Sequence, residues 1–221
     1  MKADERFPRV SSRFTILLML AITVFLLSSE PARANTLTIS IQSPSSVNAG
    51  TSGNGLDIFL TNFNGPAVSI AAFTFEISTS SAVVAFTGAD TATQLNPYIF
   101  AGNSLFGPNI TVANTGGILS ASDIFGVPAA GVLLGAGATV GLGRLWFNVS
   151  STATSQLVNL TFTGFPATGL SDEFGNNVAV ATLTGGQVNI IATTTPEPSS
   201  LTLMLTAVPL FWGWRKLRPG R

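Results

Sequence analysis

Short runs in which apolar and polar residues alternate fill the middle of the chain, between residues 35 and 195. In the segment 73–77, Phe73, Phe75 and Ile77 fall on one face of an extended strand, and Thr74 and Glu76 fall on the other. Gly, Asn, Ser and Pro separate the runs, and no stretch shows a capped amphipathic helix. The pattern predicts strands at residues 37–42, 56–62, 68–78, 82–87, 110–113, 118–122, 142–150, 157–163, 178–183 and 187–191.

Many short strands without helices predict an all-β fold, an antiparallel β-sandwich closed by a hydrophobic core. Strand alternation also predicts which side chains point inward. The residues expected to face the core are Phe73, Phe75, Ile77, Leu145, Phe147, Val149, Leu160 and Phe162.

The segment 89–139 has the least regular pattern and predicts long loops with two short strands. It holds Tyr98, Phe100, Phe106 and Phe125 among Gly, Asn and Ala. Long loops on a rigid sandwich often carry binding residues. We expect these aromatic side chains to form a small core beneath the loops, with ligand contact as the alternative.

The first 34 residues have the organisation of a signal peptide. Four basic residues precede a 14-residue apolar run at 14–27, which is shorter than the ~20 residues of a spanning helix. Pro31 follows, and then Ala32 and Ala34 flank Arg33 in a small-x-small cleavage pattern. We expect a signal helix at 1–34 and a mature chain that begins at Asn35, with an uncleaved membrane anchor as the alternative.

The tail at 193–221 has three parts in order: a Pro-Glu-Pro motif, an apolar segment at 201–214 and a basic end. Cations beside an apolar segment remain on the cytoplasmic side, and Trp212 and Trp214 suit the membrane interface. The segment predicts a hydrophobic transmembrane helix that is marginal as a permanent span, like the tail of a removable anchoring signal. The motif is Pro196, Glu197 and Pro198, and the basic stop is Arg215, Lys216 and Arg218.

This tail resembles the PEP-CTERM sorting signal. The resemblance implies that an exosortase, a membrane-embedded transpeptidase-like enzyme, reads the tail. It also implies a Gram-negative producer of exopolysaccharide, with this protein anchored at the cell surface or released into an extracellular matrix or biofilm. An ordinary tail-anchor helix is the alternative. Signal peptidase and exosortase are the expected processing partners.

The middle, residues 35–192, resembles a cohesin-like or carbohydrate-binding-module-like jelly-roll sandwich. The likeness lies in a Val-Asn-Ala-Gly turn at 47–50, in strands at 56–60, 70–77, 117–121 and 145–149, and in a closing strand at 186–190. Ser78 and Thr79 stand where that family has Tyr-Asp after the third strand. Dockerin binding is therefore not carried over to this chain.

The amino-acid composition excludes several kinds of catalytic and metal site. The chain has no Cys and no His, which excludes disulfides, thiolate metal sites, Cys nucleophiles and the usual general base near neutral pH. Arg144 is the one basic residue between positions 35 and 195, against six carboxylates. A nucleic-acid-binding domain would carry a basic patch, so we expect no nucleic-acid partner.

Two local patterns are candidate sites. Alternation places Trp146 on the outer face beside Arg144 and Asn148, where its ring could stack on a sugar, or else pack beneath a loop. The segment 171–177 gathers oxygen ligands for a calcium site around a glycine, although the same residues favour a plain turn. Its candidate ligands are Asp172, Glu173 and Asn176.

The sequence thus predicts a non-catalytic, exported surface or matrix protein without a cofactor. The alternative is a surface-displayed carbohydrate-binding module that contacts polysaccharide through Trp146. A glycoside hydrolase needs only two carboxylates, but no pair here lies in a recognisable frame.

Overall fold

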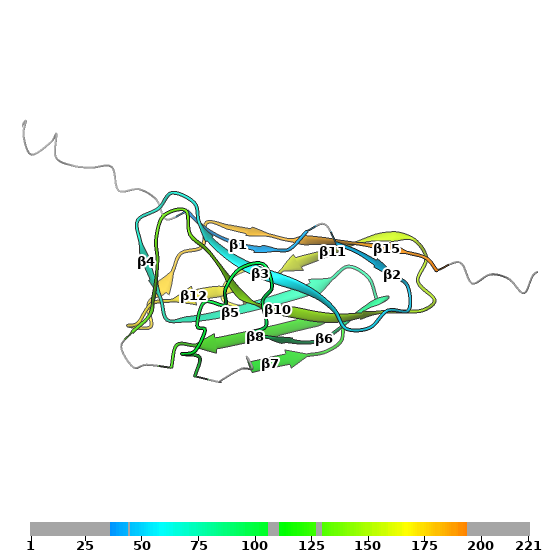
Figure 1. Ribbon diagram of the computed structural model, residues 1–221, viewed down its shortest axis with the longest axis horizontal. Coiled ribbons are helices and arrows are strands. Elements are labelled where there is room, and N and C mark those ends of the chain that lie inside the picture. Colours follow the sequence, from blue (N-terminus) through cyan, green and yellow to red (C-terminus); the bar gives the residue numbers. More distant parts are fainter. Residues whose placement is uncertain (1–35, 44, 106–110, 127–129, 194–221) are drawn as a thin grey trace, which may run out of the picture.

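Two β-sheets packed face to face form the domain (Figure 1). The computed structural model describes residues 36–43, 45–105, 111–126 and 130–193, with the side chains of 111–114 left out. Within these ranges no helix is long and apolar enough to cross a membrane. The predicted signal helix, cleavage site, sorting motif and tail helix lie outside the described residues.

The first sheet has the strand order β14-β1-β3-β10-β6. Its strands are β14 (Thr182–Thr184), β1 (Leu37–Ile41), β3 (Asn54–Asn62), β10 (Thr139–Val149) and β6 (Val84–Asp90).

The second sheet has the order β13-β12-β5-β11-β15-β2, with β8 on the other edge of β5 and β7 beside β8. Its strands are β13 (Asn177–Val178), β12 (Gly169–Ser171), β5 (Ala72–Thr79), β11 (Gln156–Phe162), β15 (Gly186–Ile191), β2 (Ser45–Asn48), β8 (Ile118–Ile124) and β7 (Thr111–Asn114). A separate antiparallel pair joins β4 (Val68–Ile70) to β9 (Val132–Leu134).

The core lies between the sheets and contains the predicted inward residues. Phe75, Ile77, Leu145 and Phe147 are fully buried, and Phe162 packs against the core from a partly buried position. The remaining predicted members, Phe73, Val149 and Leu160, are also buried. The predicted strand register is therefore confirmed for β5, β10 and β11.

The sandwich is not purely antiparallel, which corrects the prediction. Two pairs run parallel, β1 with β14 and β2 with β15. The chain passes from the first sheet to the second between β1 and β2, and again at Gly185 and Gly186 between β14 and β15. The two crossing segments are side by side, since β1 pairs with β14 and β2 pairs with β15. A Cβ on Gly186 would lie 2.7 Å from Cγ2 of Ile41, and one on Gly185 would collide with the Leu160 carbonyl oxygen. The crossing therefore needs residues without side chains.

Two predicted strands are divided. The segment 68–78 forms β4 and β5, because Ile70 and Ala71 are both buried and the alternation changes phase between them. The segment 178–183 divides into β13 and β14, which belong to different sheets. The short strands β2, β9 and β12 were not predicted, since three or four residues carry too little alternation to be recognised.

The aromatic residues of 89–139 do not form a separate small core. Phe100 is fully buried, and its ring centroid lies 5.7 Å from that of Phe73 and 6.1 Å from that of Tyr98. These contacts extend the main core below the loops, with Phe125 partly buried at its edge. Phe106 lies outside the described residues.

Candidate ligand-binding surfaces

Trp146 projects from the outer face of the first sheet, as strand alternation predicts. Its neighbours along β10, Leu145 and Phe147, are fully buried on the inner face. In register beside Trp146 lie Gly55 of β3 and Gly88 of β6. The Arg144 guanidinium fills the space above Gly55, whereas the space above Gly88 is open, and the indole is half-buried.

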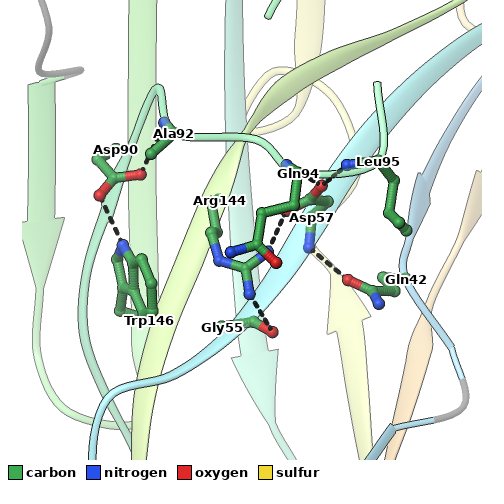
Figure 2. A network of polar contacts seen from close by, with 9 residues as sticks. All are labelled: Gln42, Gly55, Asp57, Asp90, Ala92, Gln94, Leu95, Arg144 and Trp146. Atoms are coloured by element: carbon green, nitrogen blue, oxygen red, sulfur yellow. Dashed lines mark hydrogen bonds and ion pairs between the residues drawn. The ribbon is translucent and has the colours of Figure 1, made fainter. Parts of the chain in front are cut away.

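A buried ion pair lies next to the indole (Figure 2). The Arg144 Nη1 donates to Asp57 Oδ1 at 2.6 Å, and both side chains are almost completely shielded from solvent. The other carboxylate oxygen of Asp57 accepts the backbone N–H groups of Gln94 and Leu95, at 2.7 and 2.8 Å. One carboxylate therefore neutralises the cation and also ties the loop after β6 onto the outer face of the sheet.

Trp146 belongs to the same polar network. Its Nε1 donates to Asp90 Oδ2 at 2.7 Å, and the Arg144 guanidinium carbon lies 5.0 Å from the ring centroid, within cation–π range. Asp90 in turn accepts the Ala92 N–H through its other oxygen (Figure 2). The indole is therefore outward but held by neighbours, and sugar stacking on it stays a prediction.

The predicted calcium ligands lie in the turn between β12 and β13. Asp172 Oδ1 accepts the N–H groups of Phe174 and Asn176, and Oδ2 accepts the Asn176 amide at 3.0 Å. The Asn176 side chain is the main reason that the pKa of Asp172 is lowered, with the two backbone N–H groups adding to the effect. Both carboxylate oxygens thus serve the turn itself.

Glu173 lies in the same turn, and its Oε2 is buried without a hydrogen-bond partner. Among the described residues, no cluster of three His, Cys, Asp or Glu side chains could hold a metal ion. The segment 171–177 therefore has the geometry of a turn closed by hydrogen bonds to the Asp172 carboxylate. Calcium binding here stays a prediction.

A second carboxylate, Asp123 of β8, lies inside the sandwich. It is fully buried and accepts the Tyr98 hydroxyl at 2.5 Å and the backbone N–H of its neighbour Ile124 at 2.7 Å. Burial, and then the adjacent Asp123, raise the pKa of Tyr98 far above its ordinary value. The sequence pattern offered no sign of this pair, because the two residues are 25 positions apart.

Sequence reasoning also missed a groove of about 400 Å³ on the second sheet. It lies where β12 and the loop before it meet β5 and β8, and the aromatic ring of Phe165 at its edge is 69% exposed. The sequence signal for it was a single aromatic residue, Phe165, in a short loop between two strands. The lining residues that matter below are Thr74, Ser122, Phe165, Gly169, Ser171 and Asn177.

Comparison with family models finds no match to this chain, and no curated protein matches it either. Solved structures do match. The sixth cohesin of scaffoldin B from Acetivibrio cellulolyticus, in complex with a dockerin, aligns with a TM-score of 0.52 and 18% identity. That alignment covers 70% of this chain and 99% of the cohesin chain.

Two further cohesin structures align similarly. A type I cohesin–dockerin complex from Clostridium thermocellum gives a TM-score of 0.53 at 16% identity, over 71% of this chain and 100% of the other. The seventh ScaB type I cohesin from Pseudobacteroides cellulosolvens gives 0.51 at 14% identity, over 73% and 96%. At such identities the likeness concerns the fold alone. The domain is a β-sandwich with a cohesin-like fold.

Proposed function

We propose that this chain is a non-catalytic, exported protein whose β-sandwich is displayed on the cell surface or in an extracellular matrix as a binding or adhesion module. The observation that carries the proposal is the order of segments along the chain. A signal-peptide pattern precedes a single sandwich domain, and a three-part sorting tail follows it. This order suits export of the domain and its later sorting by an exosortase-type enzyme.

The environments of the carboxylates support a non-catalytic role. Asp57 pairs with Arg144, Asp123 accepts from Tyr98, and Asp90 accepts from Trp146. Glu76 accepts the Ser120 hydroxyl at 2.8 Å on the outer face of the second sheet, and hydrogen bonds from Thr163 and Ser120 lower its pKa. Each of these groups completes a structural contact, whereas glycosidase chemistry needs two carboxyl groups facing one bond of a bound sugar.

The cohesin-like fold supports a binding role. Two of the similar structures hold a cohesin together with a dockerin, so those sandwiches bind another protein domain. We extend to this chain only the general role of a rigid module that presents a binding surface.

A carbohydrate-binding module is the second candidate. It is favoured by the outward position of Trp146, between two glycines in register, in a half-buried polar setting. Its test is the loss of polysaccharide binding in Trp146→Ala, which removes the ring, with binding kept in Trp146→Phe, which keeps an aromatic ring and removes only the N–H already bonded to Asp90.

Two measurements on surface-exposed protein test the sorting proposal. N-terminal sequencing should begin at Asn35 or within a few residues of it. Mass spectrometry of the C-terminus should show that the segment 201–221 is lost in cells with an active exosortase and kept in cells without it. An intact Met1 would contradict export by a cleaved signal, and a full tail in both strains would reduce the tail to a membrane anchor.

A further inference from the structure

The groove on the second sheet arises where β5 changes partners. One edge of β5 pairs with β11 from Ile77 to Thr79 and with β12 from Ala72 to Thr74. The loop 163–168 leaves the sheet between those two pairings and returns as β12. Short side chains of Ala72, Ser122 and Ser171 and the bare backbone of Gly169 line the resulting hollow, so it stays open.

Phe165 forms one wall of the groove. Two of its ring carbons lie 3.3 and 3.6 Å from the position that a Cβ on Gly169 would occupy, so the ring rests against the β12 backbone. The ring is nevertheless 69% exposed. On the other side of the groove, Ile124 of β8 is 43% exposed. Part of the ring therefore lies against β12 while most of it remains open to solvent, which suits contact with a ligand.

Three polar side chains in the groove are free to form hydrogen bonds with a ligand. The hydroxyls of Ser122 and Ser171 and the amide of Asn177 form no hydrogen bond within the part of the chain that the structure describes, whereas Thr74 already donates to the Ala167 carbonyl. A purely apolar ligand would cover these three groups without replacing their hydrogen bonds to water, which is costly. The ligand therefore needs polar groups of its own.

The groove has no charged residue among those that line it. Two carboxylates lie close along the chain to lining residues, and both already accept hydrogen bonds. Asp172 uses both oxygens within its own turn, and Glu76, two residues beyond Thr74 on β5, accepts from Ser120 and Thr163. A charged ligand that entered the groove would lose its hydration and find no group of opposite charge to replace it. The lining therefore suits an uncharged molecule of the size that grooves of several hundred Å³ accept.

We propose that this groove is a binding site for an uncharged saccharide. A sugar ring presents C–H groups to the face of Phe165 and hydroxyls, each both donor and acceptor, to Ser122, Ser171 and Asn177. A peptide added as a strand is disfavoured, because β12 is already paired with β5 on one side and with β13 on the other. The site goes beyond the proposed display role and does not depend on how the tail is processed.

The test uses the full chain, purified in detergent, on an array of uncharged gluco-, manno-, galacto- and xylo-oligosaccharides, with oligogalacturonate as a charged probe. We expect at least one neutral probe to bind, and Phe165→Ala or Asn177→Ala to weaken that binding about tenfold or more. Both residues are exposed, so unchanged circular dichroism spectra will show that the variants fold.

Phe63→Ala is the matched control, because it removes an exposed phenylalanine that does not line the groove. It should bind like the unaltered protein. No binding to any neutral probe, binding of the charged probe alone, or equal losses in Phe63→Ala and Phe165→Ala would overturn the proposal. Loss in Trp146→Ala alone would move the sugar site to the outer face of the first sheet, and this too would overturn it. None of these outcomes bears on the N- and C-terminal processing tests.

Discussion

Truncation of two adjacent residues of β10 tests the strand register on which both candidate surfaces depend. Phe147 is fully buried in the core, so Phe147→Ala should lower the free energy of unfolding by about 3–5 kcal/mol, through lost burial and the cavity left behind. Trp146→Ala removes a larger side chain, but one that lies half-buried on the outer face. It loses the hydrogen bond to Asp90 and the contact with the Arg144 guanidinium, together about 1–2 kcal/mol.

Urea denaturation followed by far-ultraviolet circular dichroism measures both costs without relying on tryptophan fluorescence. With a slope of about 2 kcal/mol per M, Phe147→Ala should shift the midpoint down by about 1.5–2.5 M, and Trp146→Ala by less than about 1 M. Trp146→Phe, which keeps an aromatic ring, should cost less still. Equal or inverted costs for the two alanine variants would show that the register is shifted by one residue, and the outward placement of Trp146 would be lost with it.

Three further predictions concern buried and turn residues. Tyr98 is the single tyrosine of the chain, and its raised pKa means that tyrosinate absorbance should appear only as the protein unfolds at alkaline pH, whereas in denaturant it should appear near pH 10. The free energy of unfolding should therefore keep the full contribution of Tyr98 below about pH 10 and fall above it. A Tyr98 titration midpoint near pH 10 in the folded protein would contradict the burial argument. Gly55→Ala would place a methyl group 2.6 Å from Cζ of the Arg144 guanidinium, and it should lower the free energy of unfolding, measured by urea denaturation, by about 1–3 kcal/mol. Gly88→Ala is the control, because the space at that position is open, and it should be close to neutral. Equal effects of the two variants would mean that Arg144 moves freely. Because the pKa of Asp172 is lowered in the folded protein, this carboxylate should stabilise its turn down to about pH 3.9 and lose that effect as pH falls through the folded pKa. An NMR titration of the carboxylate measures the folded pKa, and a midpoint at or above the ordinary value would refute the prediction.

Much of the fold follows from local pattern. Alternation along β5, β10 and β11 was sufficient to place Phe75, Ile77 and Phe147 in the core, because strand side chains alternate with period two whatever the strand pairs with. The same rule placed Trp146 outside. The absence of Cys and His likewise limits the available chemistry, whatever shape the chain adopts.

Pairing between distant strands decided the rest. The Asp57–Arg144 pair joins residues 87 positions apart, and the Tyr98–Asp123 pair joins a loop to a strand, so no local pattern contains either contact. The parallel pairing of the first and last strands is of the same kind, because a strand's alternation does not state which neighbour it has or in which direction that neighbour runs.

The groove shows this division most clearly. Its aromatic wall, Phe165, and its amide, Asn177, are ordinary loop and turn residues in the sequence. They become neighbours only because β12 replaces β11 on one edge of β5 and leaves a hollow over short side chains. The sequence alone determined where strands form, which side chains point inward, and which reactions the absence of Cys and His excludes, since these depend on each residue and its near neighbours. The tertiary structure alone decided which polar groups found partners and which remain open to a ligand, since that depends on where distant segments meet.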